Sequence, residues 1–283
     1  YLTVKSCEAV GGLAKHAVPF AASLELLHNF TLIHDDVMDH DEIRRGKPTV
    51  HKKYGAPMAI LAGDLLFAKV YQSVLDHAPL HMGDDEIVLA LNNITDAIIH
   101  LCEGQALDIS YPGAMDVSEK DYLDMIGGKT SSLFMACAEV GALVGGGSKE
   151  EIKSLGRFAW DAGLAFQIVD DILGIISDEE TLGKPVGSDI REGKKTLIMI
   201  HALANSNPKQ MNVLRETLGN ETSSKEEVDY VIKILEEIGS IQYARNEAGK
   251  FTERAFESIK NIPESTSKQE LIDLVNYFVR REY

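Results

Sequence analysis

The sequence predicts an all-α protein, a single-domain helical bundle around a central cavity. Apolar residues recur at three- and four-residue steps along much of the 283-residue chain, which is the period of one helix face. No segment shows the sustained alternation of apolar and polar residues that is typical of a strand. No linker rich in proline, serine or glycine interrupts the chain, so we expect one domain over residues 1–283.

Composition and charge narrow the class of protein. The net charge of −16 argues against nucleic-acid binding, because such binding requires clustered basic surface. No uninterrupted apolar stretch approaches the ~18 residues of a membrane span. The cysteines form no paired motif, so we expect reduced thiols and a cytoplasmic protein without a zinc site or disulfide; they are Cys7, Cys102 and Cys137.

The apolar period predicts where the helices lie. Gly127 and Gly128 interrupt one of them at a cost of about 1 kcal/mol per glycine. We expect them to expose backbone beside Lys129 and Thr130, where a phosphate could approach. Residues 44–55 and 174–193 are expected to be loops. The expected helices span 1–10, 14–39, 58–75, 87–109, 118–142, 152–173, 196–205, 211–218, 228–259 and 271–281.

An aspartate cluster ends the expected helix at 14–39. Asp35 and Asp39 are four residues apart and therefore share a helix face. Two carboxylates placed in this way favour a hard cation such as magnesium, which leaves positions open for phosphate oxygens. Arg44 and Arg45 follow closely, with planar guanidinium groups that suit phosphate. The alternative is a solvated acidic helix end followed by a basic loop.

A second aspartate pair occupies a matching context. Asp170 and Asp171 also follow an apolar helical run, and a basic segment containing Lys184 and Lys194 comes next. Two such helices could face each other across a cavity and hold metal ions from both sides. The pattern therefore predicts a site for a metal-bridged, phosphorylated ligand.

From Val10 to about Lys195 the sequence resembles the trans-isoprenyl diphosphate synthases. Residues 35–39 are similar to the short first aspartate-rich motif of that family, and Arg-Arg-Gly follows at 44–46. Residues 170–171 are similar to the second motif, and residues 127–130 match the Gly-Lys-Thr segment between them. Gly174 departs from the pattern, because many members carry a third aspartate there.

The resemblance implies an enzyme that condenses isopentenyl diphosphate with dimethylallyl, geranyl or farnesyl diphosphate. It also implies magnesium, as three ions, and a homodimer. The implied metal ligands are Asp35, Asp36, Asp39, Asp170 and Asp171. The implied catalytic residues are Asp35, Asp39, Asp170, Lys129 and Lys184. The implied substrate-binding residues are His28, Arg44, Arg45, Lys129, Thr130, Gln167, Lys184 and Lys194, with Lys195 as an alternative to Lys194.

Individual roles follow from the resemblance. Arg44, Lys129 and Lys184 would neutralise the allylic diphosphate, and His28 and Arg45 would hold isopentenyl diphosphate. Thr130 and Gln167 would shield the carbocation, and the released diphosphate would act as the base. Three polar residues on the expected helix at 87–109 could either support the site or have a purely structural role. They are Glu103, Gln105 and Asp108.

Two residues predict the length of the product. Phe30 and Thr31 lie five and four residues before Asp35, about 7.5 and 6 Å along the helix. A single aromatic residue five positions before the first aspartate, as Phe30 is here, resembles the pattern of those family members that stop at twenty carbons. We therefore expect geranylgeranyl diphosphate. A core-packing role for Phe30 stays open, because it is rotated by about 140° from Asp35.

Other functions are less compatible with the motifs. A terpene cyclase would not need the isopentenyl clamp, and a non-catalytic partner subunit would be expected to lose one aspartate motif. A carboxylate di-metal bundle needs two Glu-x-x-His pairs, and only Glu25 with His28 forms one. A farnesyl or bifunctional farnesyl/geranylgeranyl synthase remains the alternative. The sequence opens inside a helix pattern at Tyr1, so we expect the native domain to extend upstream, where the family has a further isopentenyl diphosphate motif.

Overall fold

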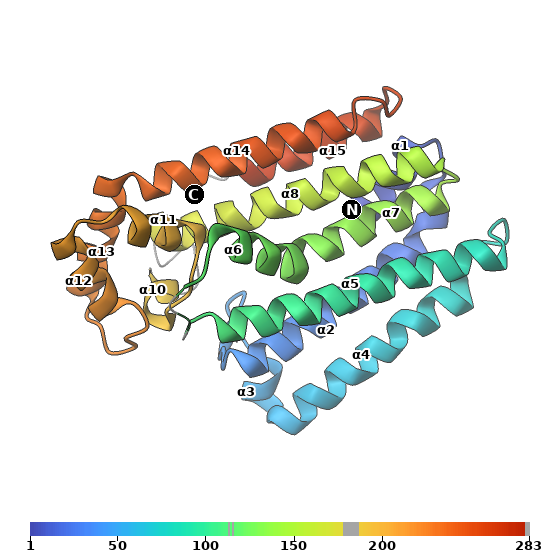
Figure 1. The fold of residues 1–283 in the computed structure, drawn as a ribbon. Coiled ribbons are helices and arrows are strands. Elements are labelled where there is room, and N and C mark those ends of the chain that lie inside the picture. The colour runs from blue at the N-terminus through green and yellow to red at the C-terminus, as the bar shows by residue number, and fades with distance from the viewer. Residues whose placement is uncertain (113, 115, 178–186, 281–283) are drawn as a thin grey trace. The chain divides into compact units, whose positions relative to one another are not determined.

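The computed structural model describes residues 1–112, 114, 116–177 and 187–280 (Figure 1). These residues form two compact units. The first unit comprises Tyr1–Ile98, Leu133–Arg157 and Ser258–Leu271. The second comprises Ile99–Ser132, Phe158–Glu257 and the C-terminal residues from Ile272.

The described residues are overwhelmingly helical, which confirms the all-α prediction. The first unit contains α1 (Leu2–Ala9), α2 (Ala14–Met38), α3 (Val50–Tyr54) and α4 (Ala56–His77). The second contains α6 (Glu119–Ile126), the π-helical turn η1 (Gly127–Ser131), α10 (Ser188–Glu192), α11 (Leu197–Asn205), α12 (Pro208–Thr217) and α13 (Lys225–Ile238). Residues of both units occur in α5 (Asp84–Ser110), α7 (Ser132–Val144), α8 (Lys149–Ile176), α14 (Ser240–Ser258) and α15 (Thr266–Val279).

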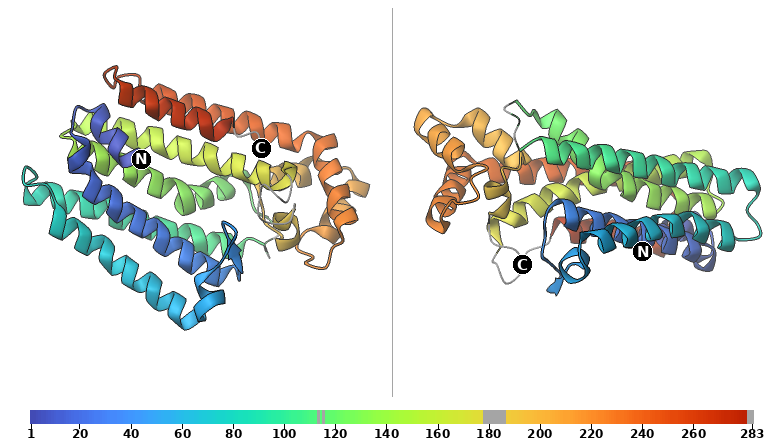
Figure 2. Two further views of the ribbon diagram at one scale, coloured as in Figure 1. Left: turned by 180° about the vertical axis from the view of Figure 1, so that it is seen from behind. Right: turned by 90° about the horizontal axis from the view of Figure 1, so that it is seen from below.

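In the first unit, α2 and α4 run side by side (Figures 1 and 2). Phe20, Leu24 and Leu27 recur at helical spacing on α2 and are buried in the core of this unit. The hydroxyl of Ser23 donates a hydrogen bond of 2.8 Å to the carbonyl of Val70 on α4. This packing fixes the end of α2, which carries the first aspartate cluster.

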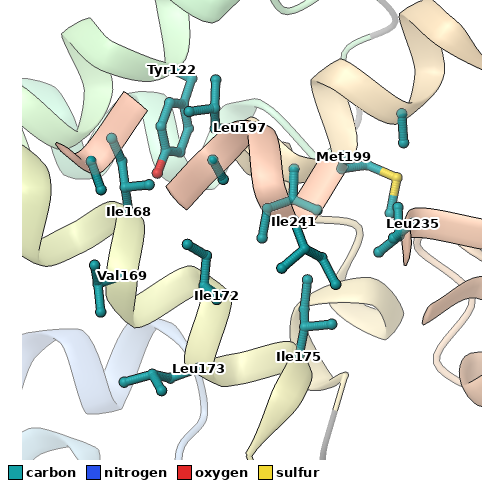
Figure 3. Packing of buried hydrophobic residues seen from close by; sticks show 14 of the residues in the cluster. Tyr122, Ile168, Val169, Ile172, Leu173, Ile175, Leu197, Met199, Leu235 and Ile241 are labelled. Atoms are coloured by element: carbon teal, nitrogen blue, oxygen red, sulfur yellow. The ribbon is translucent and has the colours of Figure 1, made fainter. Parts of the chain in front are cut away.

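In the second unit, α8 supplies a continuous apolar face. Ile168 and Ile172 pack with Leu197 of α11 and Ile241 of α14 in one buried cluster (Figure 3). The two isoleucines are four residues apart on α8 and therefore lie on one face. Because the apolar face points into this core, Asp170 is left on another side of the helix.

Several predicted boundaries were wrong for local reasons. The expected basic loop at 44–55 contains α3 and a two-stranded antiparallel hairpin, β1 (Ile43–Arg44) and β2 (Lys47–Pro48), paired as Ile43 with Pro48 and Arg44 with Lys47. The expected helix at 228–259 is two helices, because Gly239 has a φ of 80°, a left-handed conformation that ends α13. The expected loop at 174–193 includes the end of α8 and the short helix α10. Lys184 lies outside the described residues.

Candidate active site

The last turn of α2 carries Asp35 and Asp39. The backbone amide of Asp39 donates to the carbonyl of Asp35 over 2.8 Å, so the helix continues to this point. The two side chains therefore lie on one face, as the spacing predicts. Asp35 is half-buried and Asp39 is exposed.

Asp36 has a different environment. It is only 4% exposed, and its Oδ1 atom lies 2.5 Å from Nε of Arg44 on β1. Arg44 Nη2 lies 3.6 Å from Oδ2 of Asp41. Asp36 thus anchors the arginine, a contact that the sequence motif did not reveal.

Arg45 and Gly46 form the turn between β1 and β2. Their φ angles are 52° and 73°, and positive angles at both central positions are typical of a type I′ hairpin turn. This conformation is uncommon for a residue with a side chain and stores strain at the site. The turn leaves the Arg45 side chain exposed.

His28 lies two turns before Asp35 and is half-buried. Burial lowers the pKa of His28, and the positive charges of Arg45 and Arg44 lower this pKa further, against the opposing effect of Glu25. The imidazole is therefore neutral at pH 7, since its pKa lies below the ordinary value of 6.5. A neutral ring donates through one nitrogen and accepts through the other.

Phe30 belongs to an aromatic row across α2 and α4. Its ring centroid lies 4.9 Å from that of His34 and 5.4 Å from that of Phe67, and Phe67 lies 5.5 Å from Tyr71. The hydroxyl of Thr31 donates to the carbonyl of His28 over 2.8 Å. Phe30 therefore packs against His34 and Phe67 in the first unit, independently of any contact with a substrate.

The π-helical turn η1 carries Lys129 and Thr130. A side chain at Gly128 would collide with the carbonyl oxygen of His100 on α5, since an added Cβ atom would lie 2.6 Å from it. Gly104 on α5 approaches as closely, because its Cβ atom would lie 2.2 Å from the amide nitrogen of Lys129. Gly127 and Gly128 are buried, so the predicted exposed backbone was wrong. These glycines allow helices to approach closely and thereby position η1.

α8 contacts η1 in the same way. An added Cβ atom at Gly127 would lie 2.8 Å from the Trp160 ring, and one at Gly163 would lie 2.8 Å from Ser131. The turn is therefore packed closely against α5 and α8, and on α8 the Trp160 ring lies against Gly127. π-helical turns occur frequently at functional sites.

Two lysines of the second unit are paired with acidic residues. Lys129 Nζ lies 2.5 Å from Asp108 Oδ2 on α5. Lys194 Nζ lies 3.6 Å from Asp189 Oδ1 and 3.1 Å from Glu192 Oε2. Burial opposes the charge of Lys194, but Asp189, Glu192 and Asp108 outweigh it and raise its pKa. Lys194 is therefore firmly cationic.

Lys195 differs from its neighbour. Burial lowers the pKa of Lys195, whereas acidic neighbours raise the pKa of Lys194. Lys194 pairs with Asp189, and the charge of Asp108, the partner of Lys129, also raises the pKa of Lys194, which places Lys194 rather than Lys195 in the same charged group as Lys129.

A chain of hydrogen bonds joins η1 to α8 and α6. The hydroxyl of Thr130 donates to Gln167 Oε1 over 2.9 Å, and Gln167 Nε2 donates to Asp171 Oδ1 over 3.0 Å. Tyr122 Oη donates to Asp171 Oδ2 over 2.7 Å. Burial and then the charge of Asp189 raise the pKa of Asp171 to about 7, against the effect of these hydrogen bonds. Asp170, in contrast, is exposed.

The donor set fits a metal ion that is completed by substrate. Among the described residues, no three histidine, cysteine, aspartate or glutamate side chains are grouped to hold a metal ion by themselves. Asp35 and Asp39 share a face, and Asp170 is exposed. Magnesium is commonly bound by one or two carboxylates, with phosphate oxygens and water as the other ligands. Within each unit the carboxylates therefore suit a magnesium ion that is bound together with a diphosphate.

The structure groups most of the predicted residues within their own units. In the first unit it brings together Asp36 and Arg44 at the end of α2, with the charges of Arg44 and Arg45 acting on His28. Tyr122 and Asp189 were not among the site residues predicted from the sequence, and no role was predicted for Asp108. A tyrosine and an aspartate far from the motif in sequence give no local signal of such contacts. The second unit groups Lys129, Thr130, Gln167, Asp171 and Lys194 with Asp108, Tyr122 and Asp189.

The chain belongs to the polyprenyl synthetase family, whose sequence pattern matches residues 1–235. It is a trans-prenyltransferase, as the resemblance of its aspartate motifs implies. A short chain isoprenyl diphosphate synthase from Methanothermobacter thermautotrophicus is 44% identical over 283 residues, covering 100% of this chain and 85% of the relative. A geranylgeranyl diphosphate synthase from Saccharolobus solfataricus is 42% identical, covering 98% of this chain and 84% of the relative.

Solved structures agree with this classification. Geranylgeranyl pyrophosphate synthetase from Pyrococcus horikoshii superposes with a TM-score of 0.92 and 42% identity, covering 99% of this chain and 84% of that one. Geranylgeranyl pyrophosphate synthase from Corynebacterium glutamicum, complexed with isoprenyl diphosphate and magnesium, gives a TM-score of 0.90 at 25% identity, covering 99% and 85%.

Proposed function

We propose that the enzyme condenses isopentenyl diphosphate with an allylic diphosphate to give geranylgeranyl diphosphate. The observation that carries the proposal is the end of α2. There Asp35 and Asp39 share one helix face, and Oδ1 of the intervening Asp36 accepts a hydrogen bond of 2.5 Å from Nε of Arg44. Carboxylates for a cation and a fixed guanidinium for phosphate are the groups that binding a diphosphate requires. The names of the relatives support the same reaction.

Asp35, Asp39 and Asp170 would ligate magnesium, three ions by the resemblance. Magnesium supplies positive charge that stabilises the departing diphosphate. Asp36 anchors Arg44, and Arg44 and Lys129 neutralise the remaining charge of the diphosphate. Lys184, outside the described residues, keeps its predicted place in this role. Lys194 is the preferred additional contact, since its pKa is raised.

The reaction begins when the allylic carbon–oxygen bond breaks and diphosphate departs with the electron pair. The double bond of isopentenyl diphosphate, held by His28 and Arg45, then forms a carbon–carbon bond with the allylic cation. Loss of a proton completes an allylic diphosphate that is five carbons longer. The released diphosphate accepts that proton, and Thr130 and Gln167 shield the cation with their oxygen atoms.

Phe30 is proposed to limit the product to twenty carbons. The aromatic rings of α4, Phe67 above all, hold it in place from one side. Its packing does not conflict with this role, because a residue that stops a growing chain must itself be held rigidly. Thr31 is tied to the carbonyl of His28 and is too small to block the tail at its own level.

A homodimer is proposed through one face of α4. By length and composition, α4 is the one helix among the described residues that could cross a membrane, although a single such helix is weak support for a span. Its exposed positions 58, 61, 65, 68, 72 and 75 follow alternating steps of three and four, the spacing of a helix–helix seam. They are mostly apolar: Met58, Leu61, Leu65, Ala68, Gln72 and Leu75. Such a stripe suits a second copy of the chain.

The remaining proposals concern the whole chain. The two compact units are proposed to act as one catalytic domain, because the motifs required for the reaction are divided between them. A cytoplasmic location is supported by the cysteines, which are free in the described residues.

One assay tests the proposed function. The protein is incubated with labelled isopentenyl diphosphate, magnesium and each allylic diphosphate, and the products are separated by chromatography after removal of the diphosphate. The proposal expects a twenty-carbon product that requires isopentenyl diphosphate and disappears with chelator. A fifteen-carbon product would identify a farnesyl diphosphate synthase instead. A cyclic hydrocarbon formed without isopentenyl diphosphate would identify a cyclase.

A further inference from the structure

Tyr122 stands at the end of the hydrogen-bonded chain that runs to Thr130 in the second unit. Its hydroxyl donates to Asp171 Oδ2 over 2.7 Å, and the side chain is only 1% exposed. The ring lies in the apolar cluster with Ile168 and Leu197 (Figure 3). The tyrosine is therefore held rigidly by α8 and α11, and its hydroxyl donates to the carboxyl group of Asp171.

When Asp171 is ionised, the chemistry of the groups fixes the direction of every hydrogen bond in this series. A carboxylate only accepts, so the side-chain amide of Gln167 must turn its NH₂ group toward Asp171. The amide oxygen then lies on the other side and accepts the hydrogen of the Thr130 hydroxyl over 2.9 Å. The hydrogen of Thr130 is therefore committed to Gln167, and the lone pairs of its oxygen remain for another group.

This order matters for a reaction that forms a cation. A freely rotating hydroxyl or amide can present either a hydrogen or an oxygen atom, and only the oxygen stabilises positive charge. Dipoles that are fixed before the reaction cost no reorganisation as the charge develops. Thr130 follows Lys129 directly, and Gln167 precedes Asp170 by one helical turn, so both side chains belong to the motifs of the candidate site.

We propose that Tyr122 is a positioning residue that acts through Asp171 and Gln167, so that Gln167 and Thr130 present oxygen atoms to the allylic carbocation. The inference rests on the proposed function. The proposal also gives Asp171 an orienting role, because its two oxygen atoms accept hydrogen bonds from Tyr122 and Gln167. The opposing interpretation is that Tyr122 only supports Asp171 as a metal ligand.

Two unreactive ligands distinguish these interpretations. One is an allylic thiolodiphosphate, which is uncharged at the reacting carbon. The other is an ammonium diphosphate of the same length, which carries a positive charge there. Binding of each to the complete chain is measured by calorimetry with saturating magnesium. The wild type is expected to prefer the ammonium ligand, and Tyr122→Phe is expected to reduce that preference by about tenfold, the loss of about one oriented hydrogen bond to charge.

A matched control and a second variant complete the test. Tyr243→Phe removes a tyrosine hydroxyl that donates to Glu119 over 2.9 Å, also on α6, and should leave the preference unchanged. Thr130→Val removes the hydroxyl that donates to Gln167 and replaces it with a methyl group of similar size, so no cavity is left. It should lower the preference as Tyr122→Phe does, and the double variant should lose no more than the larger single loss, because the residues act as one unit.

Each outcome has one meaning. Retention of the full preference by folded Tyr122→Phe or by Thr130→Val overturns the proposal. Equal weakening of both ligands together with a raised magnesium requirement assigns Tyr122 to metal support, which also overturns it. If Tyr122→Phe does not fold, as judged by circular dichroism, full retention of the preference by Thr130→Val still overturns the proposal. Failure of the wild type to bind either ligand or to condense the substrates refutes the proposed function itself.

Discussion

At the residue scale, the two Asp-Asp pairs share one feature, because the second member of each is bonded to another side chain. Asp36 is buried against Arg44, and Asp171 is bonded to Tyr122 and Gln167. Adjacent residues on a helix point about 100° apart, so the two members of a pair cannot share a face. The environments of Asp35 and Asp170 therefore differ from those of Asp36 and Asp171. We infer that the first member of each pair ligates metal while the second anchors a side chain.

Replacement of Asp35 or Asp170 with alanine tests that division. Each change removes a carboxylate from a magnesium ion, so turnover should fall at least ~100-fold, as it does when a single electrostatic stabiliser is lost. Turnover is measured with saturating magnesium and both substrates. Asp229→Ala, at an exposed position of α13, serves as the control. Turnover like that of the wild type in either variant would contradict the metal role.

Phe30→Ala should lengthen the product beyond twenty carbons, because it removes the ring that is expected to stop the chain. Thr31→Phe should shorten the product. Leu24→Ala removes a buried side chain of α2 and controls for lost packing, since it should lower stability without changing product length. Chromatography of the products decides. If Phe30→Ala stays active and stops at the wild-type length, Phe30 only packs against Phe67 and His34.

Glu139 predicts a dependence of stability on pH. Burial raises the pKa of Glu139, and the charge of Asp96 raises it further. The folded state therefore holds this proton more strongly than the unfolded state, and its contribution is lost as pH rises from about 4.5 through the higher folded pKa. Glu139→Gln should raise the free energy of unfolding more at about pH 8 than at about pH 5, as measured with urea. An equal effect at both values would contradict the prediction.

At the scale of elements, η1 depends on glycines contributed by itself and by two neighbouring helices. Gly104 of α5 and Gly163 of α8 contact it from different helices, and its own Gly127 and Gly128 are buried. A π-helical turn is rare and departs from the regular hydrogen-bond pattern of an α-helix, so we expect tertiary packing to hold it. The position of Lys129 and Thr130 therefore depends on residues outside the motif that carries them.

Gly104→Ala should displace this turn. The new methyl group would lie 2.2 Å from the amide nitrogen of Lys129, which is impossible without movement of the backbone. We expect a loss of stability of about 1–3 kcal/mol, as in overpacked cores, together with reduced kcat. Gly249→Ala on α14 meets no atom within 4 Å and should be neutral or stabilising by up to about 1 kcal/mol. Stability, measured by denaturation, and turnover should therefore both fall for Gly104→Ala, whereas Gly249→Ala should lose neither.

At the scale of the whole molecule, we expect the apolar stripe on α4 to be covered by a partner. Leu61 and Leu65 are 62% and 59% exposed and lie one turn apart. Apolar side chains that follow the a and d spacing of a helix–helix seam are expected to be covered in solution. A second copy of the chain is the occupant that the family resemblance suggests.

The double change Leu61→Glu with Leu65→Glu should dissociate the dimer, because charges would face each other or an apolar surface across the seam. Sedimentation measures the mass in solution. Leu80→Glu, at a fully exposed position outside the stripe, should leave the dimer intact. A monomeric wild type that partitions onto lipid vesicles would assign the stripe to a membrane surface, and a double variant that stays dimeric would place the interface elsewhere.

Much of the fold and of the site could be predicted from local patterns. Helical period identifies α2, α4 and α5 because each has a long apolar face. It fails at residues 44–55, where the hairpin and α3 are too short to show a period, and at Gly239, where one backbone angle divides a helix. Residues that share a motif were predicted together, such as Asp35 with Asp39. Contacts between distant segments, such as Tyr122 with Asp171, had no local signal.

The sequence by itself predicted the helical fold and the identities of the charged groups, and the resemblance of its motifs to a known family implied the class of enzyme. These properties reside in short segments whose spacing is fixed by the geometry of a helix or a turn. Only the tertiary structure decided which aspartate anchors Arg44, how η1 is packed and which direction the hydrogen bonds behind Thr130 take. Burial and hydrogen-bond partners arise when residues far apart in the chain are packed together, and no local pattern encodes that pairing.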